Sequence, residues 1–564
     1  MIQELDVDGV PTLLAPTGGP MRAGLTFRVG TADETLARSG ITHLLEHLAL
    51  APLGLADYHV NGATAPVFTT FHMQGSAQDI ATFLTSVCAN LTELPTGRLD
   101  VEKEILRTEH SSRGTAAADD IPLWRHGARD FGITSYPEWG LGALTGDDLR
   151  QWAARWFTRE NAVLWIAGKA VPAGLRLALP AGVRQPVPAA SSALPQTPAY
   201  FVGGSRAVVL DAVVRRRTAA SVFAGVLERE LYRALRQDGG LSYQTTAGYE
   251  PRGDGNATLR ALADALPEKQ DAVLGGFVDT LAKLRVGRIE QADLDAVVAK
   301  REDFLGTAEV DAARLPSYAF NVLTGERNLT VDEHRAELKA VDTHDVHEVA
   351  REAVAGALLM VPEGHRADWA GFTEAPTRSA DTVTGTAYRE KEGDGELHVG
   401  VDGVSWLGHG GPLTVRYAQC ALMLTWPDGA RQLIGDDAIS MRIEPTMFDL
   451  HPGAIRVIDS QVPDDRQVLM PARDPERIPQ PRAAAAGSGQ REPVKRSWWE
   501  IPLMVVSGLV ALVIGGGTFL LTLGMFVTET AESDKGWLWS AIAVGWLLTV
   551  ILALPIVLLR RRRR

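Results

Sequence analysis

Two uncharged apolar runs near the C-terminus, residues 501–527 and 537–559, constrain this chain more than any other feature. Each run is long enough to cross the roughly 30 Å hydrocarbon core of a bilayer as a helix. Tryptophans flank the runs, and five consecutive arginines follow at 560–564. These arginines argue against the alternative, a helical hairpin buried in a soluble core. The pattern therefore predicts a two-helix transmembrane hairpin with a basic cytoplasmic tail at 560–564.

The residues before this hairpin predict several folded units. From 1 to 183, strand-like alternation and helical spacing follow one another, which is typical of an α+β domain. A Pro-, Ala- and Ser-rich linker follows at 184–198, and a similar order of elements recurs at 199–374. This recurrence predicts two tandem, related α/β domains.

The chain between these domains and the hairpin divides into two parts. Residues 382–459 contain short β-type runs separated by Gly and Pro, which predicts a small β-rich domain of unknown role. Residues 460–497 are rich in Pro and charge without periodicity, which predicts a flexible linker.

Charge and cysteine content limit the partners and the compartment. The formal charge of -13, without a basic patch outside the tail, argues against a nucleic-acid partner. Cys88 and Cys420 lie far apart in apolar runs, so a disulfide framework is not expected. The N-terminus has neither the basic nor the apolar region of a secretory signal. We therefore expect a multi-pass protein of the cell membrane whose globular N-terminal part is cytoplasmic.

The string HLLEH at 43–47 is the strongest chemical motif. Positions four apart on a helix lie about 40° apart around its axis, so His43 and His47 can direct their nitrogens to one point. Imidazole is a favoured zinc donor, and Glu46 lies at the edge of the same face, where it can accept a proton from a water. The motif alone is also compatible with an ordinary helix surface.

A catalytic zinc site usually has three protein ligands, so a third is needed. The helical segment DVEKEILRTEH offers Glu102, Glu104 and Glu109. Glu102 and Glu109 share a face but lie about 10 Å apart along the axis, so only one of the two can bind the metal directly. From the residues alone, a solvated charged helix remains the simpler interpretation.

Two stretches read together change that interpretation. VGTADETLARSGITHLLEHLAL resembles the active-site segment of the pitrilysin/insulinase-type zinc peptidases, the inverzincins that include mitochondrial processing peptidase. EKEILRTE resembles the acidic element that follows in that family. This resemblance implies His43, His47 and Glu109 as zinc ligands, Glu46 as the catalytic base and Glu102 as a supporting carboxylate.

The resemblance also implies residues that contact the substrate. NGATAPVFTTFHM resembles the family's substrate-pairing strand, which implies substrate-binding roles for Asn61, Ala63 and Thr64. In the second half, ELYRALRQDGGLSY resembles a region whose Arg and Tyr reach the substrate, here Arg236 and Tyr243. An Arg can hold a peptide carbonyl or carboxylate, and a Tyr hydroxyl can donate to a developing oxyanion.

The family resemblance implies a membrane-anchored, zinc-dependent endopeptidase that hydrolyses peptides or unfolded protein segments. It further implies two α/β-sandwich domains of the processing-peptidase type, and a homodimer or a heterodimer with a related subunit, because this chain carries about half of the family's enclosing architecture. The connection from His47 to Asn61 is shorter than in the family. A catalytically inactive peptidase-fold scaffold at the membrane is therefore the alternative.

Overall fold

The computed structural model describes residues 2–53, 60–112 and 116–481. Residues up to Pro481 form one compact unit. The predicted transmembrane hairpin at 501–527 and 537–559 lies outside the described residues. None of the helices within the described ranges is both long and apolar enough to cross a bilayer.

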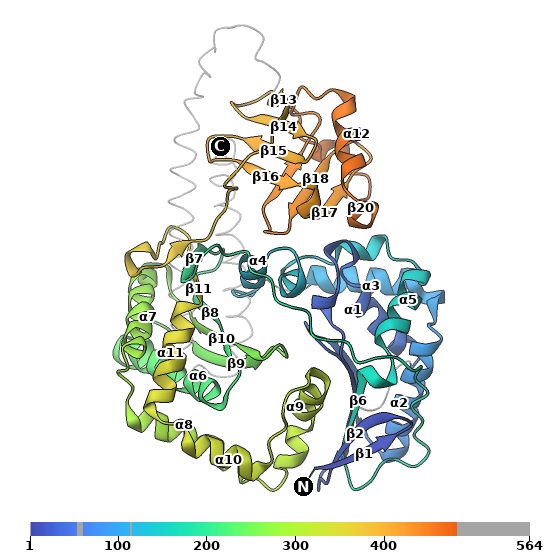
Figure 1. Cartoon of the computed structure of the whole chain (residues 1–564), viewed down its shortest axis with the longest axis vertical. Coiled ribbons are helices and arrows are strands. Elements are labelled where there is room, and N and C mark those ends of the chain that lie inside the picture. Colours follow the sequence, from blue (N-terminus) through green and yellow to red (C-terminus); the bar gives the residue numbers. More distant parts are fainter. Residues whose placement is uncertain (1, 54–59, 113–115, 482–564) are drawn as a thin grey trace, which may run out of the picture. The chain divides into compact units, whose positions relative to one another are not determined.

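The first domain is built on a six-stranded mixed sheet (Figure 1). In order across the sheet, its strands are β1 (Gln3–Val7), β2 (Val10–Ala15), β6 (Ala162–Ala167), β3 (Met21–Phe27), β5 (Thr69–Gly75) and β4 (Val60–Thr64). β2 and β6 are parallel, and the other neighbours are antiparallel. β4 is therefore an edge strand of this sheet.

Four helices pack against this first sheet, and the hydrophobic core of the domain lies between them and the sheet. The helices are α1 (Ile41–Leu50), α2 (Ala77–Thr92), α3 (Leu99–Ser112) and α5 (Gly146–Trp156). Apolar residues at helical spacing, such as Ile80, Leu84 and Leu91 of α2, are buried against Leu25 and Phe71 of the sheet. This packing fixes the orientation of α1 and α3, the two helices that carry the HLLEH motif and the glutamates.

The second domain repeats the arrangement of the first. Its strand order is β12 (Thr373–Glu374), β7 (Ala199–Val202), β11 (Ala357–Val361), β8 (Val208–Arg215), β10 (Asn256–Ala263) and β9 (Thr245–Pro251). β7 and β11 are parallel, and the strands from β11 to β9 are antiparallel neighbours, as in the first sheet. The helices are α6 (Thr218–Leu231), α7 (Gln270–Arg285), α8 (Gln291–Leu305), α9 (Val310–Thr324), α10 (Val331–Ala340) and α11 (Thr343–Ala355).

Contacts between these domains include a buried apolar cluster and a buried ion pair. Leu315, Ala319 and Leu323 of α9 share a buried apolar cluster with Leu13 and other residues of the first sheet. In addition, Arg125 of the short helix α4 (Ile121–His126) forms a buried ion pair with Asp211 of β8 and donates a hydrogen bond to the Asp211 carbonyl at 2.6 Å. Burial raises the pKa of Asp211, but Arg125 and Arg260 lower it to a net value below the usual range.

The β-rich domain consists of two four-stranded sheets. One contains β13 (Gly385–Arg389), β14 (Glu396–Gly400), β15 (Gly403–Leu407) and β16 (Leu413–Arg416). The other contains β19 (Ser440–Ile443), β18 (Arg431–Gly435), β17 (Cys420–Thr425) and β20 (Gln467–Leu469), and helix α12 (Pro452–Gln461) follows β19.

Strand β20 corrects the predicted linker at 460–497. Gln467–Leu469 pairs in parallel with Met423–Thr425 of β17, and Val468 is buried. The domain therefore continues beyond the boundary expected at 459. The strand is too short to produce a recognisable alternation, and the Pro- and charge-rich residues around it obscured its apolar character.

Candidate metal centre

The helix that carries the two histidines begins at a tightly held glycine. The buried Glu34 carboxylate accepts hydrogen bonds from the backbone N–H groups of Gly40 at 2.8 Å and Thr42 at 2.9 Å. Gly40 has a φ of 89°, a conformation that favours glycine, and a Cβ at this position would lie 2.9 Å from Cβ of Glu138. These constraints fix where α1 starts and therefore which way its side chains face.

The faces of α1 differ in their chemistry. Leu44, Leu45 and Leu48 are fully buried in the core of the first domain. His43 and His47 lie one helical turn apart and remain partly accessible, with perpendicular rings whose centroids are 4.9 Å apart. The apolar contacts therefore hold the two imidazoles side by side.

Glu109 of α3 completes a group of three possible metal ligands. Its Oε2 lies 3.9 Å from Nε2 of His43 and 3.7 Å from Nε2 of His47. One ligand atom from each residue can be chosen so that all three lie within 4.8 Å of one another. Ligand atoms around a tetrahedral zinc lie about 3.3 Å apart, so small side-chain shifts bring the three into that geometry. Two imidazoles and a carboxylate also form a donor set that suits zinc.

Each histidine has a carboxylate beside its other ring nitrogen. Nδ1 of His43 lies 2.9 Å from Oε1 of Glu138, and Nδ1 of His47 lies 3.5 Å from Oε2 of Glu102. Arg98 donates a hydrogen bond to Glu102 at 3.0 Å. A carboxylate at Nδ1 favours the tautomer with its proton there, which leaves the Nε2 lone pair for a metal. Glu102 thus lies where a supporting carboxylate was expected.

Glu138 was not identified from the sequence. It lies next to the 3₁₀ segment η6 (Trp139–Gly142), far along the chain from α1 and α3, and no motif or spacing marks it. Burial lowers the pKa of His43, but the hydrogen bond to Glu138 and its charge raise it to a net value above the usual range. Only the folded arrangement reveals that Glu138 belongs to the site.

Glu46 lies in a tight space between α1 and β4. It is 5% exposed, and the Thr64 hydroxyl donates a hydrogen bond to its Oε2 at 2.7 Å. A Cβ on Gly62 would lie 2.5 Å from Oε1 of Glu46, so the backbone of β4 approaches this closely only with glycine. Burial raises the pKa of Glu46, although Thr64 and the two histidines partly oppose this shift. A carboxylate with a raised pKa is suited to accept and return a proton.

The three predicted substrate-binding residues lie on the edge strand β4. Asn61 is opposite His72, Ala63 is opposite Thr70 and Thr64 is opposite Thr69 of β5. In the sheet as described, β4 has no strand on its other side. An extended peptide could therefore add to this edge next to Glu46.

Arg236 and Tyr243 are close to each other but in the second domain. Arg236 belongs to the π-helical segment η8 (Tyr232–Asp238), and its guanidinium lies 5.0 Å from the centroid of the Tyr243 ring. Tyr243 is 79% exposed. Within the described ranges, no hydrogen bond or ion pair joins either residue to His43, His47 or Glu109. The structure thus forms two separate groups from the predicted site residues.

Solved structures of peptidases share this fold. The first half of the periplasmic protease PqqL from Escherichia coli aligns with a TM-score of 0.52 and 14% identity over 66% of this chain and 93% of that one. A protease from Helicobacter pylori aligns with a TM-score of 0.51 and 15% identity over 64% and 98%. A peptidase M16 inactive domain from Pseudomonas fluorescens aligns with a TM-score of 0.51 and 15% identity over 64% and 97%.

These alignments show that the chain has the mixed α/β fold of M16 peptidase domains. Against the whole PqqL protease, with a TM-score of 0.53 and 12% identity, 72% of this chain covers 55% of that one. No protein-family model and no curated protein matches the sequence. Because a protease and an inactive domain are equally similar, the fold alone does not decide between catalysis and a scaffold role.

Glu34 should make the stability of the first domain depend on pH. Burial raises its pKa from 4.5 to about 7. Between these values the folded protein keeps a proton that the unfolded chain releases, so the free energy of unfolding should fall as pH rises from about 4.5 to about 7. Glu34→Gln, which has no charge, should remove up to about 3 kcal/mol of this pH dependence. Urea unfolding at pH 5 and pH 8 with a chelator present measures it.

Glu104→Gln is the matched control, because Glu104 is an exposed glutamate on α3. This variant should keep the pH dependence of the original chain. If Glu34→Gln and the original chain lose stability equally between the two pH values, the buried Glu34 carboxyl does not have the raised pKa.

Proposed function

We propose that the chain is a zinc-dependent endopeptidase of peptides or unfolded protein segments. The observation that carries this proposal is the convergence of His43, His47 and Glu109 on one point beside the buried Glu46 carboxylate. A zinc ion held there would supply Lewis-acid chemistry toward a peptide carbonyl and a water. A scaffold that only retains the fold has no need for this combination of ligands and base.

The residues around the metal centre have distinct roles in the proposed reaction. Glu46 accepts a proton from the attacking water and returns it to the leaving amine. Thr64 holds the Glu46 carboxylate through its 2.7 Å hydrogen bond. The free edge of β4 binds the substrate in an extended form, which places a scissile bond near Glu46. Glu138 and Glu102 orient the imidazoles through their Nδ1 atoms.

Substitution of single carboxylates separates metal binding from catalysis. The purified chain should contain one zinc per molecule by elemental analysis. Glu109→Gln should lose the zinc, because a neutral amide is a poor ligand, whereas Glu46→Gln should keep it and lose peptide hydrolysis by about 10²–10⁴-fold. Glu104→Gln, on the same helix as Glu109 but exposed and paired with Arg107, should change neither. A purified chain without zinc would refute the proposal and favour the scaffold alternative.

We further propose that two chains combine to complete each active site. Arg236 and Tyr243 have the chemistry to bind a substrate carbonyl and an oxyanion, and Tyr243 is largely exposed. The chain spans about half of PqqL. A homodimer in which the Arg236 and Tyr243 pair of one chain faces the metal centre of its partner satisfies both observations. A heterodimer with a related subunit is the other arrangement compatible with them.

Mixing two inactive variants tests the homodimer. One variant is Glu46→Gln, and the other is Tyr243→Phe with Arg236→Ala. If each site uses both chains, coexpression should restore about a quarter of the activity, since half of the dimers are mixed and one of their two sites is intact. Each variant expressed alone is the control. Activity that stays at the level of the single variants, with dimers present, would exclude sites shared between identical chains.

The membrane attachment is also a proposal, because the predicted hairpin at 501–527 and 537–559 lies outside the described residues. We propose that this hairpin anchors the chain in the cell membrane with the globular part in the cytoplasm. The full chain should resist alkaline extraction from membranes, and a chain ending at Pro481 should not. Recovery of both proteins in the soluble fraction would refute the anchor.

A further inference from the structure

The second domain contains a structural counterpart of the metal centre. In the first domain the centre is formed by α1, α3 and the edge strand β4. The equivalent position in the second domain lies between α6, α8 and the edge strand β9, because β7, β11, β8, β10 and β9 have the same order and directions as β2, β6, β3, β5 and β4. The fold therefore builds the same kind of space twice.

This second space is a cavity of about 810 Å³ with a different chemistry. Four basic residues line it, together with aromatic side chains and a single carboxylate, Glu228. It contains no histidine or cysteine, and among the described residues the one possible metal-ligand group is that of the first domain. The basic residues are Arg229 and Arg233 of the α6 and η8 segment and Lys300 and Arg301 of α8.

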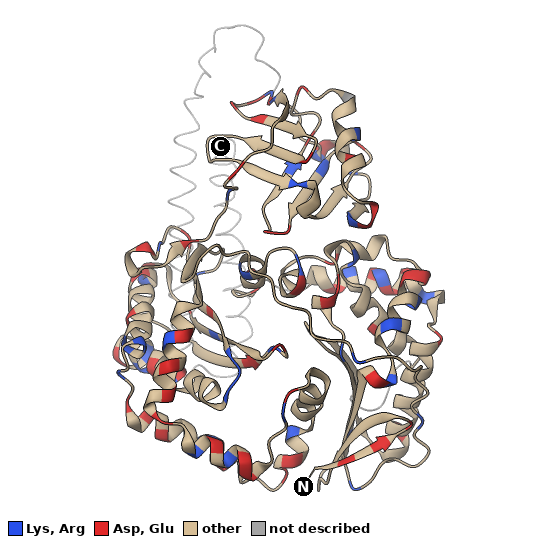
Figure 2. Ribbon diagram, viewed as in Figure 1, with Lys and Arg blue, Asp and Glu red and all other residues tan. Residues whose placement is uncertain are grey.

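The cavity carries more positive charge than its carboxylates neutralise. Arg229 and Arg233 both bind the buried Asp293, at 2.8 Å and 2.6 Å. Arg233 also binds the buried Glu230, which pairs with Lys283, and Lys283 in turn lies 3.8 Å from Glu290. The four cations that line the cavity therefore outnumber the carboxylates in it or bound to them, which are Glu228, Asp293 and Glu230. Acidic and basic residues are otherwise mixed along the described helices (Figure 2). A surplus of cations inside a cavity of a chain with a formal charge of -13 favours an anionic ligand.

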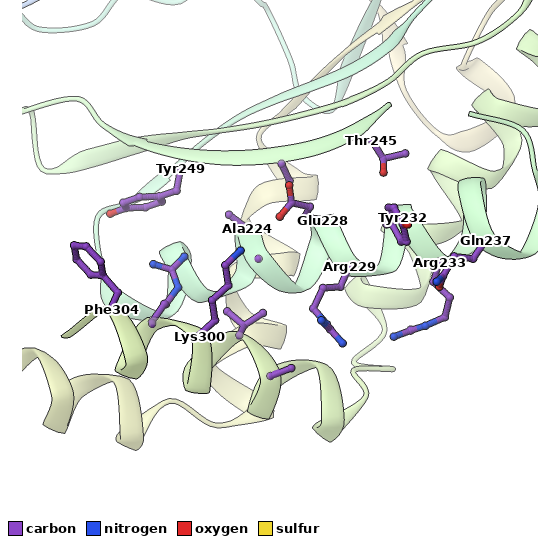
Figure 3. A pocket seen from close by; sticks show the side chains of 15 residues that line it. Ala224, Glu228, Arg229, Tyr232, Arg233, Gln237, Thr245, Tyr249, Lys300 and Phe304 are labelled. Carbon is purple, nitrogen blue, oxygen red and sulfur yellow. The ribbon is translucent and has the colours of Figure 1, made fainter. Parts of the chain in front are cut away.

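Lys300 and Arg301 provide the charge that is available to such a ligand. No ion pair within the described ranges involves Lys300, which is exposed and reaches from α8 toward α6 (Figure 3). Arg301 donates to the Ser221 carbonyl, and its Nε has no hydrogen-bond partner. The buried Thr245 hydroxyl on β9 also lacks a partner in the protein. These polar groups remain unsatisfied by the protein itself.

The shape of the cavity favours an extended ligand. Its lining runs along one helical segment from Ala224 to Gln237, a distance of about 20 Å at the helical rise of about 1.5 Å per residue. Tyr249 and Phe304 lie at one end, and Arg233 and Gln237 lie at the other (Figure 3). An extended peptide of about six residues spans this length, whereas a compact anion would contact only part of it.

We propose that this cavity binds an acidic peptide segment in extended form. Its carboxylates pair with Lys300 and Arg301, and an apolar side chain packs between Tyr249 and Phe304. The binding does not depend on the proposed hydrolysis, because none of the metal-centre residues lines the cavity. The second domain thus has side chains that recognise negative charge at the position where the first domain has metal ligands.

Fluorescence anisotropy of a labelled peptide with alternating Glu and Ala residues tests the proposal. The full-length chain is used in a Glu46→Gln background, so that the peptide is not consumed. The acidic peptide should bind, and its counterpart with Gln in place of Glu should bind at least about tenfold more weakly. Lys300→Glu should weaken binding of the acidic peptide by about tenfold, and Lys300→Gln by less. Higher ionic strength should weaken it further.

Arg351→Glu is the matched control, because Arg351 is an exposed basic residue on α11 that does not line the cavity. It changes the net charge as Lys300→Glu does, and it should leave binding unchanged. Equal binding of the acidic and neutral peptides, or equal loss in the two charge variants, overturns the proposal. Displacement of the peptide by inorganic pyrophosphate at concentrations below the peptide's own Kd would instead identify a site for compact anions. If the chain holds no zinc or does not hydrolyse peptides but still binds the acidic peptide, only the proposed enzyme activity is refuted.

Discussion

The candidate site depends on how one short helix is held. α1 has about three turns, and on its own such a helix is marginally stable. Its start is fixed by the Glu34 carboxylate and by Gly40, and its apolar side is fully buried. As a result, His43, Glu46 and His47 have little freedom to move. Glu109 from α3 and Thr64 from β4 can then meet them at short distances.

The β-rich domain contributes to this rigidity. Leu422, Leu424 and Val468 of its second sheet pack against Leu36 and Ile133 in a shared buried cluster. Leu36 lies between Glu34 and Gly40, and Ile133 belongs to the segment that leads to Glu138. The β-rich domain therefore supports both the segment that holds the start of α1 and the segment whose Glu138 holds the His43 imidazole. This gives the domain a structural role that its sequence did not indicate.

Local patterns predicted the parts of the structure that depend on neighbouring residues. The four-residue spacing of His43 and His47 places both on one face because every α-helix has the same periodicity. The recurrence of elements at 199–374 predicted a second domain, and the order β7, β11, β8, β10, β9 in its sheet matches β2, β6, β3, β5, β4 in the first. The position of Glu109 beside the histidines required the family resemblance, because no local pattern brings α3 against α1.

The residues that were missed act through contacts between distant segments. Glu138 reaches His43 from the residue before a 3₁₀ segment, and β20 pairs with β17 from within a Pro-rich stretch. The cavity of the second domain combines Arg233 with Lys300, which come from separate helices. Each of these residues has an ordinary sequence environment, so its role follows only from the tertiary arrangement.

Duplication explains why such sites occur at matching positions. The strand order and the helices that flank the edge strand are set by the buried core, whereas the side chains that face the space between them contribute little to folding. Those positions can change their chemistry freely, and in this chain one copy carries imidazole and carboxylate while the other carries guanidinium and ammonium groups.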